Sequence, residues 1–445
     1  MPSPDYAQTL SRLQDGTATI GIIGLGYVGL PLALAGVKAG YKVIGFDISQ
    51  GRVDAINGGE QVISYMDPTE MREAVAAGKF EASADFARLA EPDALAICVP
   101  TPLTRNRDPD LSYVVATAEM IAKTLRPGQL VVLESTTWPG TTREVVQPIL
   151  EAAGGVVGET FFLGFSPERE DPGNTSFNTK TIPKLVGADD PQSRKLAETF
   201  YGKTVAQVVP VNSAAVAEAA KLTENIFRAV NIALVNELKL VYAEMGIDVW
   251  EVIAAAATKP FGYQAFYPGP GLGGHCIPID PFYLTWKARE FGIESRFIEL
   301  AGQINTSMPR HVVSELARAL NAQDGKGLKG AKVLILGLAY KSDVDDLRES
   351  PSLTLIDLIE AQGAHVDFHD PHIPVVPMTR EHAELSGRVS VPLDAVNLAG
   401  YDAVLISTDH AAVDYALVAE HAKLIVDTRN ALAKRGIDAR QAVKA

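Results

Sequence analysis

The 445-residue sequence has little cysteine and carries none of the patterns that cysteine-based sites need. Its two cysteines, Cys98 and Cys276, are too few for a disulfide framework, and no C-x-x-C metal-ligand spacing occurs. Such a composition is typical of a reducing compartment, so we expect a cytoplasmic protein with no metal. The net charge is −14 and no long basic run offsets it, so binding to nucleic acid is not expected.

Signals for secretion and for membrane insertion are also missing. The first sixteen residues do not have the charged and then apolar layout of a signal peptide. Residues 16–37 carry no charge, but they contain several glycines and Pro31, which do not suit a membrane span. We therefore expect no membrane association, and a chain of this length predicts two or three domains.

The N-terminal half alternates short apolar runs with helix-like stretches. "TIGIIG" (19–24), a helix over 30–39 and "YKVIGFD" (41–47) form a βαβ unit. Further strands are predicted at 94–100, 129–135, 184–188 and 204–211. This alternation predicts a doubly wound, mostly parallel sheet over residues 1–210.

The pattern of apolar and polar residues changes after residue 210. Residues 213–245 contain neither Gly nor Pro, show apolar residues at helical spacing and are followed by Gly246, which predicts one long helix. Helical sequence continues to about residue 320, and 321–330 looks like a linker. Strands are then predicted near 332–337, 365–369, 403–407 and 424–427. The fold class is therefore α/β, with two Rossmann-like doubly wound domains (1–210 and 326–445) joined by a long helix and a helical domain (211–325).

The first strand runs into a dinucleotide-binding fingerprint. Gly24, Gly26 and Gly29 satisfy G-x-G-x-x-G between a strand and a helix, where the free N–H groups of the helix face a diphosphate. Asp47 ends the second strand, where a carboxylate can accept both ribose hydroxyls and would repel a 2′-phosphate. NAD is therefore expected rather than NADP; Arg52 either faces the adenosine or is solvated. The stretch "GLAYKSD" (337–343) lacks the spacing, so the second α/β domain is expected to bind another nucleotide-like ligand or to be structural.

Cys276 lies in the loop "PGPGLGGHCIPIDP" (268–281), whereas Cys98 in "LAICVPTP" looks like a small core residue. A thiolate can attack an aldehyde, lose hydride to NAD and leave a thioester, which water activated by a carboxylate such as Asp280 then hydrolyses. His275 either helps to lower the pKa of the thiol or is structural. A bystander cysteine in a tight turn is the alternative.

Four other residues suit this chemistry, although each has an ordinary alternative. Lys221 and Asn225 share one face of the long helix and could stabilise an oxyanion, but a lysine on a helix is more often solvated. Glu168 in "SPERE" and Asp280 in "IPIDP" have the same alternative, and Asp280 before Pro281 is also a good N-cap. Thr136 follows a strand end, where α/β sheets place ligand contacts.

Together these stretches resemble the UDP-glucose/GDP-mannose dehydrogenase family, whose members use NAD to oxidise C6 of a nucleotide sugar twice. The resemblance rests on "GLGYVGLPLA", "CVPTP", "ESTTWPGT", "SPER", "KLTENIFRAVNIALVNEL", "GPGLGGHCIPIDP" and "GLAYKSDVDDLRESPS", which span nearly the whole chain in order. It implies that Cys276 is the nucleophile, that Lys221 and Asn225 stabilise the oxyanion and that Asp280 and Thr136 position water. Glu168 then acts as an acid/base or orients water.

The resemblance also implies two sets of ligand contacts. Those expected for NAD are Gly24, Gly26, Tyr27, Val28, Gly29, Asp47, Arg52, Thr101, Thr136 and Arg348. Those expected for the UDP-sugar are Glu168, Arg169, Lys221, Asn225, Tyr267, Gly271, Gly273, Tyr340, Lys341 and Arg429. A homodimer or higher homo-oligomer paired through the long helix, and a place in surface-polysaccharide biosynthesis such as O-antigen synthesis, are further implications.

The loop sequence favours one branch of the family. Ile279 stands where UDP-glucose members usually have lysine, and "SPEREDPG" stands in place of a "SPEFLREG"-like segment. Pro260 and Phe261 stand near the position of an arginine in those members. These departures favour UDP-N-acetylglucosamine, with UDP-N-acetylmannosamine, UDP-N-acetylgalactosamine and UDP-glucose as alternatives. A non-catalytic NAD-binding scaffold, a two-electron dehydrogenase and a nucleotide-sugar epimerase are the rivals from other classes.

Overall fold

The computed structural model describes residues 3–63, 66–104, 108–169, 181–274, 276–379 and 381–445. The chain separates into two compact units. Unit 1 comprises residues 1–224 and 282–293, and unit 2 comprises residues 225–281 and 294–445. The three domain boundaries expected from the sequence stay a prediction.

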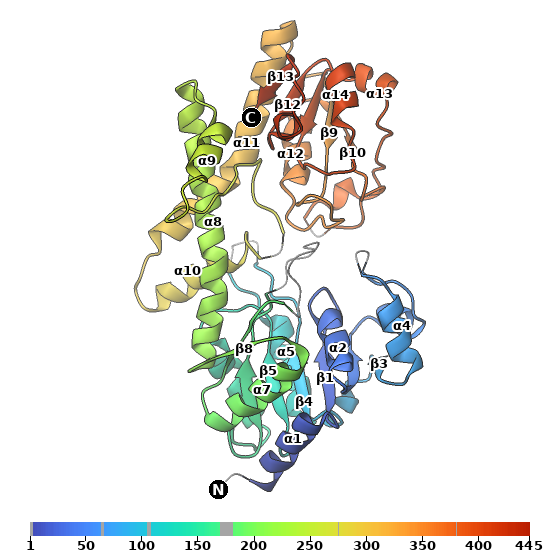
Figure 1. The fold of residues 1–445 in the computed structure, drawn as a ribbon, viewed down its shortest axis with the longest axis vertical. Helices are drawn as coiled ribbons and strands as arrows, with labels where there is room; N and C mark the ends of the chain where they lie inside the picture. The colour runs from blue at the N-terminus through green and yellow to red at the C-terminus, as the bar shows by residue number, and fades with distance from the viewer. Residues whose placement is uncertain (1–2, 64–65, 105–107, 170–180, 275, 380) are drawn as a thin grey trace. The chain divides into compact units, whose positions relative to one another are not determined.

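Unit 1 is built on an eight-stranded sheet within its described residues, with strand order β3-β2-β1-β4-β5-β6-β7-β8 (Figure 1). Every neighbouring pair is parallel except β6 and β7, which confirms the mostly parallel sheet expected from the sequence. The strands are β1 (Thr19–Ile23), β2 (Lys42–Phe46), β3 (Phe80–Ser83), β4 (Ala94–Ile97), β5 (Leu130–Leu133), β6 (Phe162–Phe165), β7 (Lys184–Gly187) and β8 (Val208–Val211).

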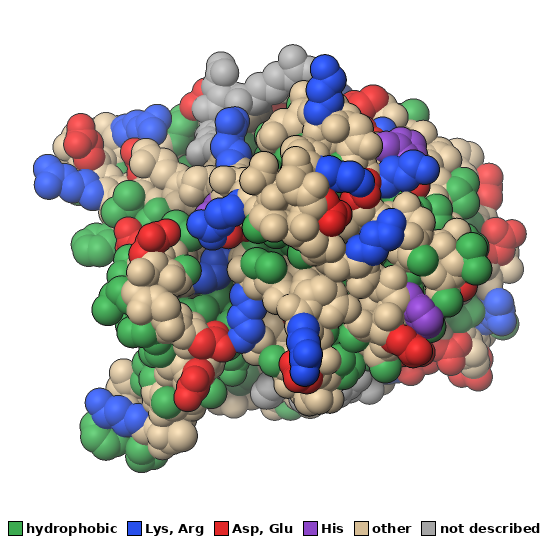
Figure 2. Space-filling view, turned by 90° about the horizontal axis from the view of Figure 1, so that it is seen from above, with side chains coloured by type: hydrophobic (Ala, Val, Ile, Leu, Met, Phe, Trp, Pro, Cys, Tyr) green, Lys and Arg blue, Asp and Glu red, His purple; other side chains and the backbone are tan. Residues whose placement is uncertain are grey.

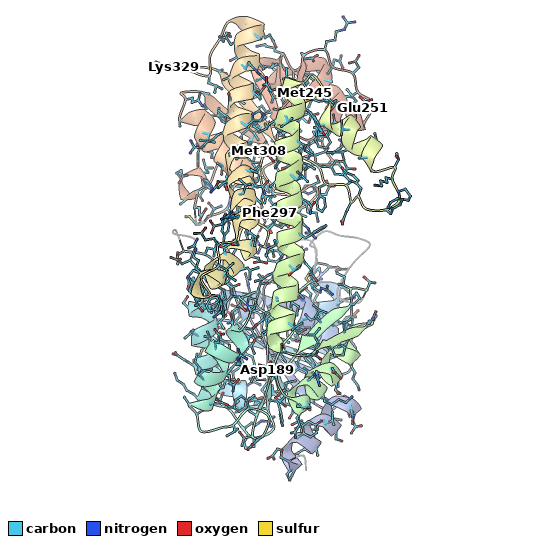
Figure 3. All side chains as sticks on the ribbon, turned by 90° about the vertical axis from the view of Figure 1, so that its left-hand side faces the viewer. Asp189, Met245, Glu251, Phe297, Met308 and Lys329 are labelled. Atoms are coloured by element: carbon cyan, nitrogen blue, oxygen red, sulfur yellow. The ribbon has the colours of Figure 1, made fainter. Side chains whose placement is uncertain are left out.

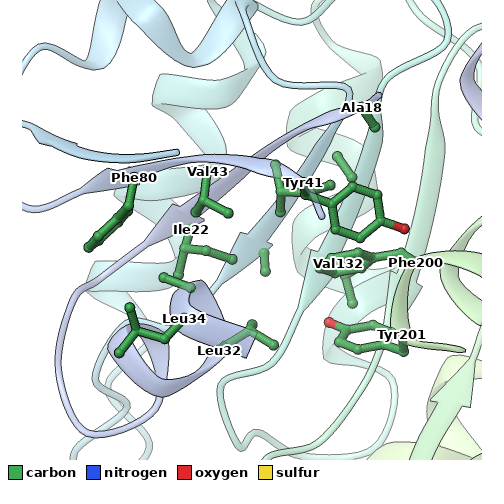
Figure 4. Packing of buried hydrophobic residues seen from close by; sticks show 14 of the residues in the cluster. Ala18, Ile22, Leu32, Leu34, Tyr41, Val43, Phe80, Val132, Phe200 and Tyr201 are labelled. Carbon is green, nitrogen blue, oxygen red and sulfur yellow. The ribbon is translucent and has the colours of Figure 1, made fainter. Parts of the chain in front are cut away.

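The core of unit 1 explains why the first βαβ pattern folds as it does. Ile20 of β1 pairs in register with Val43 of β2 and with Ala94 of β4, and all three side chains are fully buried. Figure 4 shows Ile22, Leu32 and Tyr201 among the side chains of this core. Cys98 packs against it, as expected of a small hydrophobe.

The helices of unit 1 surround this sheet. They are α1 (Pro4–Asp15), α2 (Gly29–Lys38), α3 (Gln50–Asn57), α4 (Thr69–Ala76), α5 (Ser112–Ala122), α6 (Gln147–Glu151) and α7 (Pro191–Thr204), with the 3₁₀-helix η1 (Phe86–Ala90) and the π-helix η2 (Thr142–Val146). Most of α10 (Asp280–Glu290) also belongs to unit 1. There Trp286 packs against Trp138 with ring centroids 4.6 Å apart and the rings tilted by 38°. Lys287 forms an ion pair with Glu144 at 2.5 Å.

Unit 2 carries a second sheet, with five parallel strands in the order β10-β9-β11-β12-β13 among its described residues. Its strands are β9 (Lys332–Leu336), β10 (His365–His369), β11 (Ala403–Ile406), β12 (Ile425–Asp427) and β13 (Ala442–Lys444). Its other elements are α9 (Val249–Ala256), α11 (Arg296–Asp324), α12 (Pro351–Glu360), η3 (Ala383–Leu385), α13 (Ala395–Gly400), α14 (Tyr415–His421) and α15 (Ala431–Lys434).

The linker expected over residues 321–330 begins later than predicted. Residues 321–324 were predicted to open a linker, but α11 continues through them and ends only at Gly325, which adopts the left-handed conformation with φ 65°. "NAQD" contains no helix breaker, so the helix runs until the first residue that can adopt this conformation without strain.

The long helix α8 (Ala214–Glu244) buries several polar side chains beside apolar ones such as Leu222 and Val235, and it exposes other apolar side chains. Its buried polar side chains are Glu218, Lys221, Asn225, Asn236 and Lys239. Its exposed apolar side chains are Val216, Phe227, Leu234 and Val241, each about half exposed. Figure 3 shows α8 beside α11, whose Asn305 donates to the carbonyl oxygen of Ala229 at 3.0 Å.

Within the described residues, no helix combines the length and the apolar character that crossing a bilayer requires. On the face drawn in Figure 2, basic and acidic side chains are interspersed, and apolar side chains gather toward the left of the view. This is the side on which Figure 1 places α8 and α9 of unit 2.

Candidate active site

The turn after β1 has the geometry of a dinucleotide cradle. Gly24 has φ +92°, and a Cβ added there would lie 2.6 Å from the carbonyl oxygen of Cys98. A Cβ added at Gly29 would overlap the carbonyl oxygen of Gly24. At Gly26, by contrast, the nearest atom to an added Cβ is Nη1 of Arg52 at 3.9 Å. Two glycines therefore permit close packing of the protein, and Gly26 leaves its outer side open to a diphosphate at the start of α2.

Asp47 lies at the end of β2 beside this turn. Its Oδ2 accepts a hydrogen bond from the N–H of Leu25 at 3.0 Å, and its Oδ1 accepts one from the N–H of Ser49 at 2.9 Å. A carboxylate offers about four acceptor positions, so each oxygen can still accept a ribose hydroxyl. Arg52 lies 3.8 Å from Asp47 and is partly exposed. These residues fit NAD, and Tyr27 and Val28 lie in the same turn.

The two threonines predicted to contact NAD follow the ends of β4 and β5. Thr101 is buried, and its carbonyl oxygen accepts a hydrogen bond from the hydroxyl of Tyr283 at 3.0 Å. Thr136 is half-buried, directly after the buried Ser135. Both belong to unit 1.

A buried ionic cluster lies next to Glu168 in unit 1, and the sequence analysis missed it. Nζ of Lys184 donates to Oε2 of Glu134 at 2.6 Å, and the hydroxyl of Tyr201 donates to the other oxygen. Burial raises the pKa of Glu134, and the ammonium of Lys184 opposes this rise. Burial alone would lower the pKa of Lys184, but the charge of Glu134 outweighs it and raises that pKa. Nζ of Lys184 also lies 3.9 Å from Oε2 of Glu168.

Arg169, predicted to contact the sugar nucleotide, is held by protein groups. Its guanidinium forms an ion pair with Glu224 and donates from Nη1 to the carbonyl oxygen of Pro183 at 2.7 Å. Residues 170–173, the second half of the "SPEREDPG" segment, lie outside the described residues.

Lys221 is only 7% exposed, so the interpretation of this residue as a solvated surface lysine is wrong. One turn before it on α8, the fully buried Glu218 accepts hydrogen bonds from the N–H of Gly140 and from Thr142. Burial raises the pKa of Glu218. This carboxylate ties α8 to the loop that follows β5.

The loop that carries Cys276, the candidate reactive cysteine, ends in a helical turn in unit 2. The carbonyl oxygen of Cys276 accepts from the N–H of Ile279 at 3.2 Å and from the N–H of Asp280 at 2.8 Å. Asp280 is 2% exposed, and its Oδ2 accepts from Nδ2 of Asn225 at 2.6 Å. The structure therefore brings together Cys276, Asp280 and Asn225, whereas His275 lies outside the described residues.

The glycines before Cys276 let the loop pack against another segment of unit 2. An added Cβ at Gly273 would lie 2.5 Å from Cβ of Tyr340, and one at Gly274 would lie 2.8 Å from the ring of Tyr340. The N–H of Gly274 donates to the carbonyl oxygen of Arg348 at 2.9 Å. Gly271 has φ +147°, a conformation that favours glycine. Close packing, and not an open space, explains why these positions are glycine.

The buried carboxylate of Asp370 fixes the segment that carries Tyr340 and Lys341. Asp370 accepts from the N–H groups of Leu338 at 2.6 Å and Ala339 at 3.1 Å. Nε2 of His410 lies 3.1 Å from the same oxygen, and Nδ1 of His410 accepts from the N–H of Asp343 at 3.0 Å. The proton of this imidazole is therefore on Nε2, directed at Asp370.

The remaining predicted ligand residues of unit 2 are two arginines and a tyrosine. Arg348, predicted to contact NAD, forms a bidentate ion pair with Asp346. Arg429 follows β12 and donates from Nε to the carbonyl oxygen of Ser407 at 2.8 Å. A Cβ at Gly269 would overlap its guanidinium, so the backbone of the loop lies against Arg429. Tyr267 is about half exposed and stacks on Trp250.

Three family models match successive parts of the chain. They are described as the NAD binding domain, the central domain and the UDP binding domain of the UDP-glucose/GDP-mannose dehydrogenase family, and they match residues 18–205, 215–307 and 334–434.

Curated proteins and solved structures agree with these models. The chain is 35% identical over 395 residues to a UDP-N-acetyl-D-glucosamine 6-dehydrogenase of Pseudomonas aeruginosa, covering 88% of this chain and 90% of that one. It is also 35% identical over 402 residues to an NDP-N-acetyl-D-galactosaminuronic acid dehydrogenase of Ralstonia nicotianae, covering 88% and 90%. The structure of a UDP-D-ManNAc dehydrogenase from Pyrococcus horikoshii superposes with a TM-score of 0.85 at 31% identity, covering 96% of this chain and 98% of that one. The chain therefore belongs to the UDP-glucose/GDP-mannose dehydrogenase family and is an NAD-dependent UDP-sugar dehydrogenase.

Proposed function

We propose that the chain oxidises C6 of UDP-N-acetylglucosamine to a carboxylate in two successive two-electron steps. One water is consumed and two NADH are formed for each sugar. The observation that carries the proposal is the arrangement of Cys276, Asp280 and Asn225. A thiol stands one turn before a buried carboxylate that an amide from α8 orients at 2.6 Å.

The first oxidation converts the C6 alcohol to an aldehyde, and the second needs a nucleophile. NAD⁺, held by the cradle at Gly24–Gly29 and by Asp47, supplies the hydride acceptor for both. Sγ of Cys276 adds to the aldehyde carbon to form a thiohemiacetal, whose C–H is then oxidised to give a thioester. A water attacks the thioester while Asp280 accepts its proton, and the thiolate of Cys276 is released with the acid.

The other roles in the proposal concern charge that develops during these steps. Asn225 holds Asp280 through one N–H of its amide and keeps its second N–H available for an oxyanion. Lys221 lies four residues before Asn225 on the same helix and supplies positive charge to that oxyanion. Thr136 and Glu168 are proposed to orient water, and the ammonium of Lys184 contributes positive charge beside Glu168.

The choice of sugar depends on the loop sequence and not on overall similarity. Relatives named for N-acetylglucosamine, N-acetylgalactosaminuronic acid and N-acetylmannosamine are 35%, 35% and 34% identical to the chain, so identity does not separate them. Ile279, 7% exposed, stands where UDP-glucose members usually have lysine, which favours a UDP-N-acetylhexosamine. UDP-N-acetylmannosamine, UDP-N-acetylgalactosamine and UDP-glucose stay as alternatives.

The test is the yield of NADH for each UDP-sugar consumed, with the four sugars offered separately. We expect two NADH per sugar and the highest kcat/KM with UDP-N-acetylglucosamine. Two NADH with a different preferred sugar would change the specificity and keep the chemistry. One NADH per sugar, or epimerisation without NADH, would mean that Cys276 is not a nucleophile, and no turnover with any sugar would favour a non-catalytic scaffold.

A pair of cysteine variants separates the thiol chemistry from general damage. Cys276→Ser should abolish formation of the acid. Cys98→Ala should leave it intact, because burial raises the pKa of the Cys98 thiol well above its usual value and keeps that thiol unreactive. Equal acid yields from both variants would contradict the assignment.

We also propose that two chains pair through the apolar face of α8. Phe227, Leu234, Val241 and Met245 recur at spacings of seven, seven and four residues and are 48–63% exposed. Because such spacing places them along one side of the helix, a second copy of this helix would bury them all. We expect Leu234→Glu to halve the mass measured by light scattering. Arg228→Glu serves as the control, because this exposed position of the same helix lies away from the line of apolar residues. An unchanged mass for Leu234→Glu would contradict this pairing.

A further inference from the structure

The ammonium of Lys239 is a buried positive charge, and the proposed catalytic steps do not use it. Lys239 lies near the C-terminal end of α8 and is 8% exposed. Its Nζ has no hydrogen-bond partner among the described residues. A buried cation without hydrogen bonds is costly, because it has lost its hydration and gained nothing in return. Such a group is retained where another ligand completes its environment.

The charges around Lys239 come from two other elements of unit 2. Arg429, after β12, raises the cost of a second positive charge, whereas Glu315 of α11 lowers that cost. The carboxylate of Glu315 is itself shared with Arg318 in an ion pair. His311, also on α11, has its pKa lowered by burial and by Lys239. Asp409 and Asp427 face Arg429 and compensate its charge, whereas Lys239 has only the shared carboxylate of Glu315.

The backbone of the glycine-rich loop runs through the same region. The N–H of Gly269 donates to Oδ1 of Asn236 at 3.0 Å, and Asn236 lies three residues before Lys239 on α8. The opposite side of Gly269 contacts the guanidinium of Arg429. Asn236 is fully buried and also donates to Oδ1 of Asn305 at 3.0 Å, which fixes the loop, α8 and α11 in one arrangement.

We propose that Lys239 and Arg429 together bind the diphosphate of the nucleotide sugar, with Lys239 supplying a charge that the free protein does not compensate. This inference rests on the proposed function, since it assigns part of the substrate of the same enzyme to a new residue. A diphosphate carries the negative charge that the surroundings of Lys239 lack, and it offers several acceptor oxygens to both cations. It would bind beside the loop at Gly269, whose backbone lies against the guanidinium of Arg429.

A proton should accompany this binding. Burial, followed by the charge of Arg429, lowers the pKa of Lys239 to about 8, so that near this pH part of the free protein carries a neutral amine. A bound diphosphate stabilises the ammonium, and binding therefore takes up a proton. Arg429, with a pKa lowered to about 10 by burial, stays charged over most of the same range, and His311 loses its proton at lower pH. The phosphate itself is fully ionised above about pH 7.

The experiment is calorimetric titration of the full chain with UDP at pH 7, 8 and 9, in two buffers of different ionisation enthalpy. For the wild type we expect affinity to fall roughly tenfold between pH 7 and pH 9, with uptake of a fraction of a proton near pH 8. Lys239→Met should bind UDP roughly 10- to 150-fold more weakly at pH 7 and lose both the pH dependence and the proton uptake.

Three controls make the result specific. Lys239→Arg keeps the charge at every pH used, so it should bind UDP without the loss of affinity at pH 9. Lys329→Met removes an exposed lysine of unit 2, labelled in Figure 3, and should match the wild type. Uridine, which has no phosphate, should bind wild type and Lys239→Met alike.

Thermal denaturation without ligand separates a binding role from a structural one. Removing a buried charge without partners should leave the melting temperature of Lys239→Met unchanged or raise it, while UDP stabilises this variant less than the wild type. A lower melting temperature of the free variant, or UDP affinity equal to that of the wild type, would overturn the inference. Either result would leave the NADH yield untouched. A failure of Cys276 chemistry with normal Lys239-dependent UDP binding would in turn reject only the proposed function.

Discussion

Substitution of Lys184 tests whether the buried charges of Glu134 and Lys184 in unit 1 stabilise the fold by compensating each other. Glu134 and Lys184 are 1% and 5% exposed, and Nζ lies 2.6 Å from Oε2. In Lys184→Met the carboxylate of Glu134 stays buried and keeps only the hydrogen bond from Tyr201. Breaking a buried pair from one side costs about 3–5 kcal/mol, since the remaining charge is uncompensated.

This cost converts to a melting temperature lower by roughly 6–20 °C for a unit of this size. The exposed Lys195, on α7 of the same unit, is the matched control, and Lys195→Met should change stability by less than about 0.5 kcal/mol. The double variant Glu134→Gln/Lys184→Met removes both charges and keeps an acceptor for Tyr201. It should therefore recover most of the loss.

The loss of stability in Lys184→Met should also depend on pH, in a direction that a packing defect would not produce. Without Lys184, burial holds the pKa of Glu134 above its usual range, so the folded chain binds a proton that the unfolded chain releases. The free energy of unfolding then increases as the pH falls toward the unfolded pKa of about 4.3. Denaturant unfolding at pH 8 and pH 5 should show a smaller defect at pH 5. A loss below about 1 kcal/mol, or a defect independent of pH, would refute the reasoning.

Three further predictions concern the site. Gly29→Ala places a Cβ on the carbonyl oxygen of Gly24 and should weaken NADH binding by more than about tenfold, as measured by fluorescence titration. Gly51→Ala is the control, because a Cβ there meets nothing within 4 Å and should not weaken binding. Equal NADH binding by both variants would contradict the close packing at Gly29. Gly273→Ala places a Cβ 2.5 Å from Tyr340 and should raise KM for the UDP-sugar while the affinity for NADH is unchanged; an unaltered KM would mean that the loop does not need this contact. Asp280→Asn should lower kcat for acid formation by about 10²-fold or more, and normal hydrolysis of the thioester by this variant would exclude Asp280 as the base.

The sequence predicts the parallel sheets well because their strands are short apolar runs bounded by turns. β1 and β2 begin and end within one residue of the predicted ranges, and α8 within one residue at each end, since Gly246 stops the helix. β3, β6 and β13 were not predicted. β3 is the four-residue stretch "FEAS" and β13 the three-residue stretch "AVK", too short for a period to show.

The burial of polar side chains on α8 was harder to predict from the sequence than the strands were. Hydrophobic periodicity assumes that apolar residues face the core, whereas here Lys221, Asn236 and Lys239 are buried and Phe227 and Leu234 are exposed. A signal did exist: Lys239 follows Lys221 by eighteen residues, five full turns, so both lie on one face. The cluster around Glu134 and Lys184 joins residues fifty positions apart, and only the folded sheet brings them together.

Neither compact unit is a continuous stretch of chain. Residues 282–293 return to unit 1 after the chain has entered unit 2, and there Trp286 covers Trp138, which is 8% exposed. A fragment that ends at Glu224 would therefore lack part of its own interior and would uncover an indole. Two of the three tryptophans of the chain meet at this position, so intrinsic fluorescence reports directly whether the returning segment is in place. Truncation at the apparent domain border should produce an insoluble fragment, and complementation by a peptide of α10 would be visible in the emission spectrum.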